Sequence, residues 1–173
     1  MYYIRKLTKT SSLNKIKSAN TFEDTESDVL KDEFKTSSSR LSFWKCEDLN
    51  NYTETINAIL FSGSDIKASS FIALSDKDLN DIGVVTDDSA LGKTGYKGHG
   101  NLHIDLCLPH IQQIKDLMGL YHKMPTVFLT LEKPDVQKYI KNVIAAGNYD
   151  ENNTDEHLKK EIQKLQEKSF PRI

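Results

Sequence analysis

The stretch GHGNLHIDLCLPH, residues 98–110, decides the fold that we expect for this chain. Apolar and polar residues alternate over residues 102–108, so the leucines and the isoleucine share one face of an extended chain. Alternation with a period of two over a run of this length indicates a half-buried strand. The opposite face of the strand carries three polar side chains, those of His103, Asp105 and Cys107.

A helix follows this strand, and the pattern then repeats. Pro109 suits the first turn of a helix, where its missing N–H needs no partner, and apolar residues spaced three and four apart continue close to His122. Residues 126–132 are typical of a second apolar strand, and a second helix begins at Pro134 and stops before Gly147. Two strands joined through a helix by short connections form a βαβ unit, which predicts that they lie parallel and side by side.

The rest of the pattern places this unit in an α/β domain. The βαβα unit spans residues 101–147, and further strands are expected at residues 2–7, 40–46 and 71–74 and beside Val84. The sequence therefore predicts an α/β fold with a sheet of about five strands and helices packed on it. A mixed α+β arrangement is the alternative.

The length of 173 residues fits one globular domain with a C-terminal extension. The expected domain is residues 1–149, and within it residues 8–40, rich in serine, threonine and charged residues, form the segment expected to be most mobile. Residues 150–173 predict an amphipathic helix whose narrow apolar stripe docks on the domain, on a second subunit or on a partner. That stripe consists of Leu158, Ile162 and Leu165.

Composition and charge narrow the class of protein. The formal net charge is −2 with acids and bases mixed along the chain, so no basic stripe favours nucleic acid as a partner. Two cysteines far apart in sequence, Cys46 and Cys107, do not make a disulfide framework. Neither a signal peptide nor a membrane-spanning apolar run is evident, and we expect a cytoplasmic protein in a reducing compartment with no membrane contact.

The polar face of residues 102–108, with the two histidines that flank it, is the candidate functional site. Imidazole, carboxylate and thiolate groups are all ligands for metals such as zinc or manganese, although no particular cofactor is indicated. The candidate metal ligands are His99, His103, Asp105, Cys107 and His110. Without a metal, His103 is a candidate catalytic base whose tautomer is fixed by Asp105. The competing interpretation is that these side chains have no functional role, because the solvent-facing side of a strand is ordinarily polar.

The sequence contains no complete catalytic motif. The tripeptide Gly-Lys-Thr at residues 92–94 matches the end of a phosphate-binding loop, but Asp87 stands where that loop needs its first glycine. We therefore expect a non-enzymatic accessory subunit of a larger complex, of the kind encoded in bacterial operons, which binds another protein or itself through the C-terminal helix. The alternative is a phosphoester-type hydrolase with a site at residues 99–110, which uses a metal ion or the pair His103 and Asp105.

Overall fold

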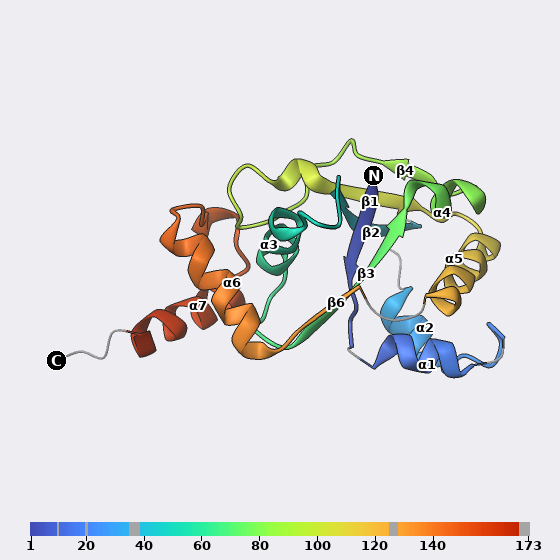
Figure 1. Ribbon diagram of the computed structural model, residues 1–173, viewed down its shortest axis with the longest axis horizontal. Coiled ribbons are helices and arrows are strands. Elements are labelled where there is room, and N and C mark those ends of the chain that lie inside the picture. Colours follow the sequence, from blue (N-terminus) through green and yellow to red (C-terminus); the bar gives the residue numbers. More distant parts are fainter. Residues whose placement is uncertain (10, 20, 35–38, 125–127, 170–173) are drawn as a thin grey trace.

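A six-stranded antiparallel sheet forms the centre of the molecule (Figure 1). The computed structural model describes residues 1–173 except residues 10, 20, 35–38, 125–127 and 170–173. The strands are β1 (Tyr2–Lys6), β2 (Arg40–Cys46), β3 (Ser69–Ser75), β4 (Val85–Asp87), β5 (His103–Cys107) and β6 (Leu129–Leu131). They lie in the order β4-β5-β2-β1-β3-β6, and every neighbouring pair is antiparallel.

Helices cover both faces of this sheet, and each face has its own apolar core. The α-helices are α1 (Ser12–Ser18), α2 (Ser27–Glu33), α3 (Thr53–Ser62), α4 (Asp76–Asp81), α5 (Ile111–Lys123), α6 (Lys133–Ala145) and α7 (Glu156–Ser169). The shorter 3-10 helices are η1 (Gly100–Leu102) and η2 (Glu151–Asn153). The first core is formed with α1, α2 and α5, and the second with α3, α6 and α7, which lie on the other side of the sheet (Figure 1).

The central strands contribute to both cores because successive residues of a strand point to opposite faces. Tyr3 of β1 belongs to the first core, and its neighbour Ile4 belongs to the second. Phe43 and Trp44 of β2 divide in the same way. A strand buried on both sides carries apolar residues at successive positions, so its sequence lacks the clear alternation of a half-buried strand.

The α/β class is confirmed, but the predicted parallel pairing of strands at residues 102–108 and 126–132 is wrong for the described residues, which do not include residues 126 and 127. β5 pairs with β2 and β4, whereas β6 pairs with β3 at the opposite edge of the sheet. The order strand, helix, strand, helix is present, yet β2, β1 and β3 lie between the two strands. Hydrophobic periodicity identifies a strand from local residues, whereas its neighbours depend on contacts distant in sequence.

β5 confirms the expected half-buried strand. Ile104, Leu106 and Leu108 are at most 3% exposed and pack in the first core. The side chains of His103, Asp105 and Cys107 are half-buried, and the strand pleat directs them to the other face. Leu102 departs from the prediction, because it belongs to η1 and packs against the second core.

Local sequence signals set several helix ends. Ser75 caps α4: its hydroxyl accepts a hydrogen bond from the Asp78 N–H at 3.2 Å, and its own N–H donates to the Asp78 carboxylate at 2.8 Å. α5 begins two residues after Pro109. Gly147, just beyond α6, has a φ of +73°, a left-handed conformation that glycine adopts without steric strain.

The segment of residues 8–40 contains α1 and α2, and a buried carboxylate fastens its start to α2. Glu33 has no exposed surface, and its oxygens accept hydrogen bonds from the N–H of Thr8 at 2.9 and 3.1 Å and from the N–H of Lys9 at 3.3 Å. The end of β1 is thereby tied to the end of α2. The greater mobility expected of this segment stays a prediction.

The C-terminal helix α7 docks on the rest of the chain. Its apolar stripe, Leu158, Ile162 and Leu165, is at most 7% exposed and joins the second core. Asp155 caps the helix through hydrogen bonds from the N–H groups of residues 157 and 158, at 2.8 and 3.4 Å. None of the described helices has the length and apolar character that crossing a membrane requires.

Candidate functional site

His103 and Asp105 lie side by side on β5, as the strand pattern predicts. Nε2 of His103 is 3.5 Å from Oδ1 of Asp105. Both side chains are largely enclosed, with exposed fractions of 14% and 13%. A carboxylate beside an imidazole helps to orient the ring, so the pair combines the two residue types of a base and its orienting acid.

Polar side chains from β2 and β4 surround Asp105. The hydroxyl of Ser42, directly opposite on β2, donates a hydrogen bond to Oδ1 at 3.0 Å. Nη1 of Arg40 lies 3.7 Å from Oδ2 of Asp105 and 2.6 Å from Oδ2 of Asp87 on β4. The network therefore crosses three neighbouring strands and fastens the short edge strand β4 to the sheet.

This network changes the acidity of the groups at its edge. Hydrogen bonds from the side chain and backbone of Ser89, together with the ion pair to Arg40, lower the pKa of Asp87 to about 2. The backbone N–H of Ser89 donates to Asp87 at 2.9 Å. In return, the hydrogen bond to Asp87 raises the pKa of Arg40. Both groups are therefore charged at neutral pH.

The loop that follows β4 covers His103. Gly92 lies so close that a Cβ atom there would collide with the Cβ of His103. The indole of Trp44 packs edge-on against the imidazole, with the ring centroids 5.4 Å apart. Nδ1 of His103 lies 3.4 Å from the carbonyl oxygen of Ala90. Each ring nitrogen thus faces an acceptor within the chain.

The other three candidate metal ligands have different surroundings. His99 stacks on Tyr96 with the centroids 3.9 Å apart, and its Nε2 lies 3.8 Å from Glu54. Cys107 ends β5 opposite Arg40 of β2, and His110 is exposed at the start of α5. In the described part of the chain, no three His, Cys, Asp or Glu residues are grouped so that they could hold a metal ion. The metal assignment stays a prediction.

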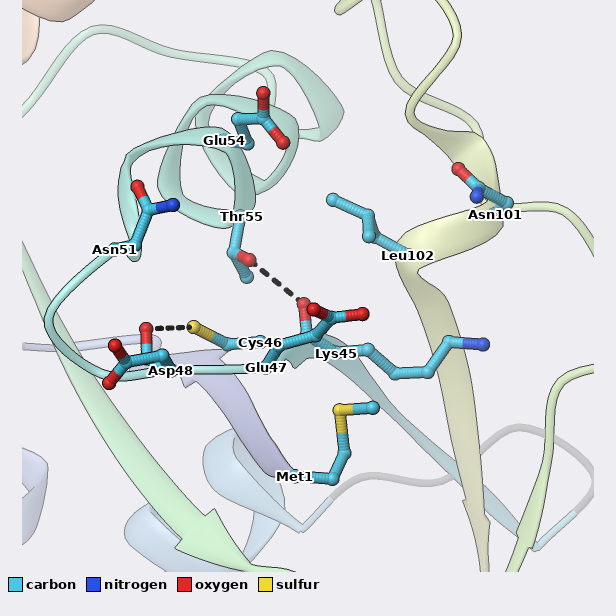
Figure 2. A pocket seen from close by; sticks show the side chains of 10 residues that line it. All are labelled: Met1, Lys45, Cys46, Glu47, Asp48, Asn51, Glu54, Thr55, Asn101 and Leu102. Carbon is cyan, nitrogen blue, oxygen red and sulfur yellow. Dashed lines mark hydrogen bonds between the residues drawn. The ribbon is translucent and has the colours of Figure 1, made fainter.

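A cavity of about 440 Å³ opens beside Glu54, and Asn101 and Leu102 also line it (Figure 2). Carboxylates and amides line it, among them those of Glu47, Glu54 and Asn51. Cys46 at its floor is 3% exposed, and its thiol donates a hydrogen bond to the carbonyl of Asp48 at 3.2 Å (Figure 2). Burial raises the pKa of this thiol, so the cavity holds a protonated cysteine that is a poor nucleophile.

A second cavity of about 450 Å³ lies on the other side of Asn101, which lines both. It is bounded by the glycine-rich loop and carries Lys93 and Lys97. Neither cavity is lined by His103 or Asp105. His103 and Asp105 therefore lie outside both cavities. The polar network that includes Asp105 joins β2, β4 and β5, and this structural role accounts for it.

Sequence reasoning found His103 and Asp105 but missed the residues that surround them. Arg40 and Ser42 share a face of β2, which the alternation at residues 40–46 shows in the sequence. Their encounter with Asp105 depends on the register between β2 and β5, for which the sequence carries no local signal. Comparison with protein-family models, with curated proteins and with solved structures finds no match to this chain.

Proposed function

We propose that this chain is a non-enzymatic interaction domain, an accessory subunit that binds a partner protein along the β4 edge of its sheet. β4 pairs with β5 on one side and is the last strand of the described sheet on the other. An edge strand offers backbone N–H and C=O groups to an incoming extended segment. A partner that adds a strand here extends the sheet.

Exposed apolar side chains in β4, in the loop that follows it and at the start of α5 carry the proposal. Val85 lies in β4, Leu91 lies in the loop that follows it, and Ile111 begins the helix after β5, the strand that pairs with β4. Their exposed fractions are 65%, 78% and 62%. We call these three residues the β4 margin. Burial of one such side chain contributes roughly 1.5–3 kcal/mol, so a partner that covers the β4 margin is favoured.

The polar network around Asp105 supports this proposal, because it gives His103 and Asp105 a structural role that does not require catalysis. Arg40 bridges Asp87 of β4 and Asp105 of β5. A strand of three residues has few backbone hydrogen bonds of its own, and these side chains hold it in place as a docking edge. The apolar stripe of α7 is buried in the chain's own core, so the proposal places the partner at the β4 margin and not on α7.

Site-specific photo-crosslinking in cells that produce the protein tests this proposal. A benzophenone amino acid is placed at position 85 or 111, and at position 163 on the exposed face of α7 as the control. We expect the same crosslinked protein from positions 85 and 111 and none from position 163. With the probe at position 111, the additional substitution Val85→Lys should weaken crosslinking of the partner about tenfold. This change corresponds to roughly 1.4 kcal/mol of binding free energy. Equal crosslinking at all three positions, or none, contradicts the proposal.

One observation favours a second candidate, a hydrolase of the phosphoester type with a metal ion or a histidine base. Nε2 of His103 and Oδ1 of Asp105 are 3.5 Å apart, a distance that suits a base and its orienting group. The test is turnover of bis(4-nitrophenyl) phosphate by purified protein, with and without added zinc or manganese, beside His103→Asn. Hydrolysis that His103→Asn abolishes supports the hydrolase, and equal rates for the two proteins refute it.

A further inference from the structure

Residues 88–93 leave the sheet directly after β4, and we call this segment the flap. Its residues are exposed except Gly92, which is half-buried. Leu91, beside that glycine, is 78% exposed. A segment that buries so little of its surface gains little stability from packing, so it can open locally while the rest of a fold stays intact.

The chain is held firmly at both ends of the flap. Before it, Asp87 ends β4, and its carboxylate lies 2.6 Å from Nη1 of Arg40. After it, the buried hydroxyl of Thr94 and the N–H of Gly95 donate hydrogen bonds to carbonyl groups of α3, at 2.8 and 3.1 Å. The two ends are therefore fixed anchors, and any local motion is confined to the residues between them.

Few bonds hold the flap itself against the rest of the chain. The N–H of Gly92 donates to the carbonyl of Gly100 at 2.9 Å. The carboxylate of Asp88 lies 3.2 Å from the ammonium of Lys45, but the carboxylate is 67% exposed, and an exposed ion pair contributes little. The cavity of about 450 Å³ described above borders residues 91–93, so this part of the flap is not fully packed against protein.

The flap covers the imidazole of His103 and one edge of the Trp44 indole. A Cβ atom on Gly92 would collide with the Cβ of His103 and would lie 2.8 Å from Cη2 of Trp44. The carbonyl oxygen of Ala90 lies 3.4 Å from Nδ1 of His103, which is too long for a strong hydrogen bond. The close contact is thus steric, and it depends on a glycine at position 92.

We propose that the flap is a gate, which moves away from the sheet between its two anchors and uncovers the imidazole of His103. In the closed state Gly92 and the carbonyl of Ala90 cover one side of the ring. In the open state a small molecule can reach Nδ1, while Nε2 still faces Asp105 at 3.5 Å. The gate is a property of the chain alone and needs no partner at the β4 margin.

Hydrogen exchange of the full chain, followed by nuclear magnetic resonance, tests the gate through two glycine amides. The N–H of Gly92 in the flap and that of Gly95 in the anchor each donate to a backbone carbonyl, at 2.9 and 3.1 Å, so they form a matched pair. After correction for intrinsic rates, we expect Gly92 to exchange at least about tenfold faster than Gly95, because it opens without the rest of the fold. Equal protection of the two amides overturns the proposal.

Acrylamide quenching of tryptophan fluorescence gives a second readout, because Trp44 is the only tryptophan and is 6% exposed. Gly92→Ala prevents the flap from closing, so the quenching constant should rise at least about twofold with an unchanged far-ultraviolet circular dichroism spectrum. Gly119→Ala, which has open space around it in α5, should quench like the wild type. Equal quenching in the two variants overturns the proposal. If Gly92→Ala does not fold, the exchange rates of the wild-type protein decide.

Discussion

Replacing Ile162 by alanine tests how firmly α7 belongs to the rest of the molecule. Ile162 is 1% exposed in the second core. The substitution removes the equivalent of three buried methylene groups, worth about 2.4 kcal/mol by transfer alone, and the cavity left behind raises the loss to about 3–4 kcal/mol. For a chain of this size we expect the Tm to fall by roughly 6–16 °C.

Urea unfolding followed by circular dichroism measures this loss, with Gln163→Ala as the matched control. Gln163 is the next residue along the helix and is exposed, so its replacement should change the free energy of unfolding by less than about 0.5 kcal/mol. Ile162→Ala should unfold in one transition at a lower urea concentration. If it unfolds at the same concentration as Gln163→Ala, or if α7 melts in a separate early step, the reasoning about docking is refuted.

Three further predictions follow from other parts of the fold. The lowered pKa of Asp87, about 2 against an ordinary 3.8, stabilises the fold above pH 4 and is lost as pH falls through 2. The difference in urea midpoint between wild type and Asp87→Asn should therefore shrink in acid, and a constant difference would contradict this. Burial and a hydrogen bond to a carboxylate raise the pKa of Tyr3 to about 12. This contribution is complete below pH 10 and disappears as pH rises through 12, and the ring resonance of Tyr3 should titrate near 12, not near 10. Gly92→Ala should destabilise the fold by about 1–3 kcal/mol because its Cβ meets His103. Gly119→Ala, in the middle of α5 with open space around it, should stabilise the fold by about 0.5–1 kcal/mol, and equal unfolding midpoints for the two variants would rule out the close contact at Gly92.

The elements that the sequence predicted are those whose signals are local. β5 was visible because apolar and polar residues alternate along it, and the start of α5 was visible because Pro109 suits the first turn of a helix. The faces of α5 and α6 followed from spacings of three and four residues. Each of these features depends on residues that are near one another in the chain.

The features that could not be predicted depend on distant pairs. β6 lies beside β3, and β5 beside β2, because of register and packing that no single segment encodes. For the same reason the sequence gives no sign that Arg40 meets Asp87 and Asp105, or that the loop at Gly92 closes over His103.

The middle position of β1 has a consequence for how the molecule assembles during synthesis. β1 is synthesised before β2 and β3 and pairs with one of them on each side, so each of these later strands finds its partner already made. β4 is the exception to this order. It is made before β5, its described partner, and because Asp87 pairs with Asp105, about eighteen more residues must be added before β4 can begin to pair.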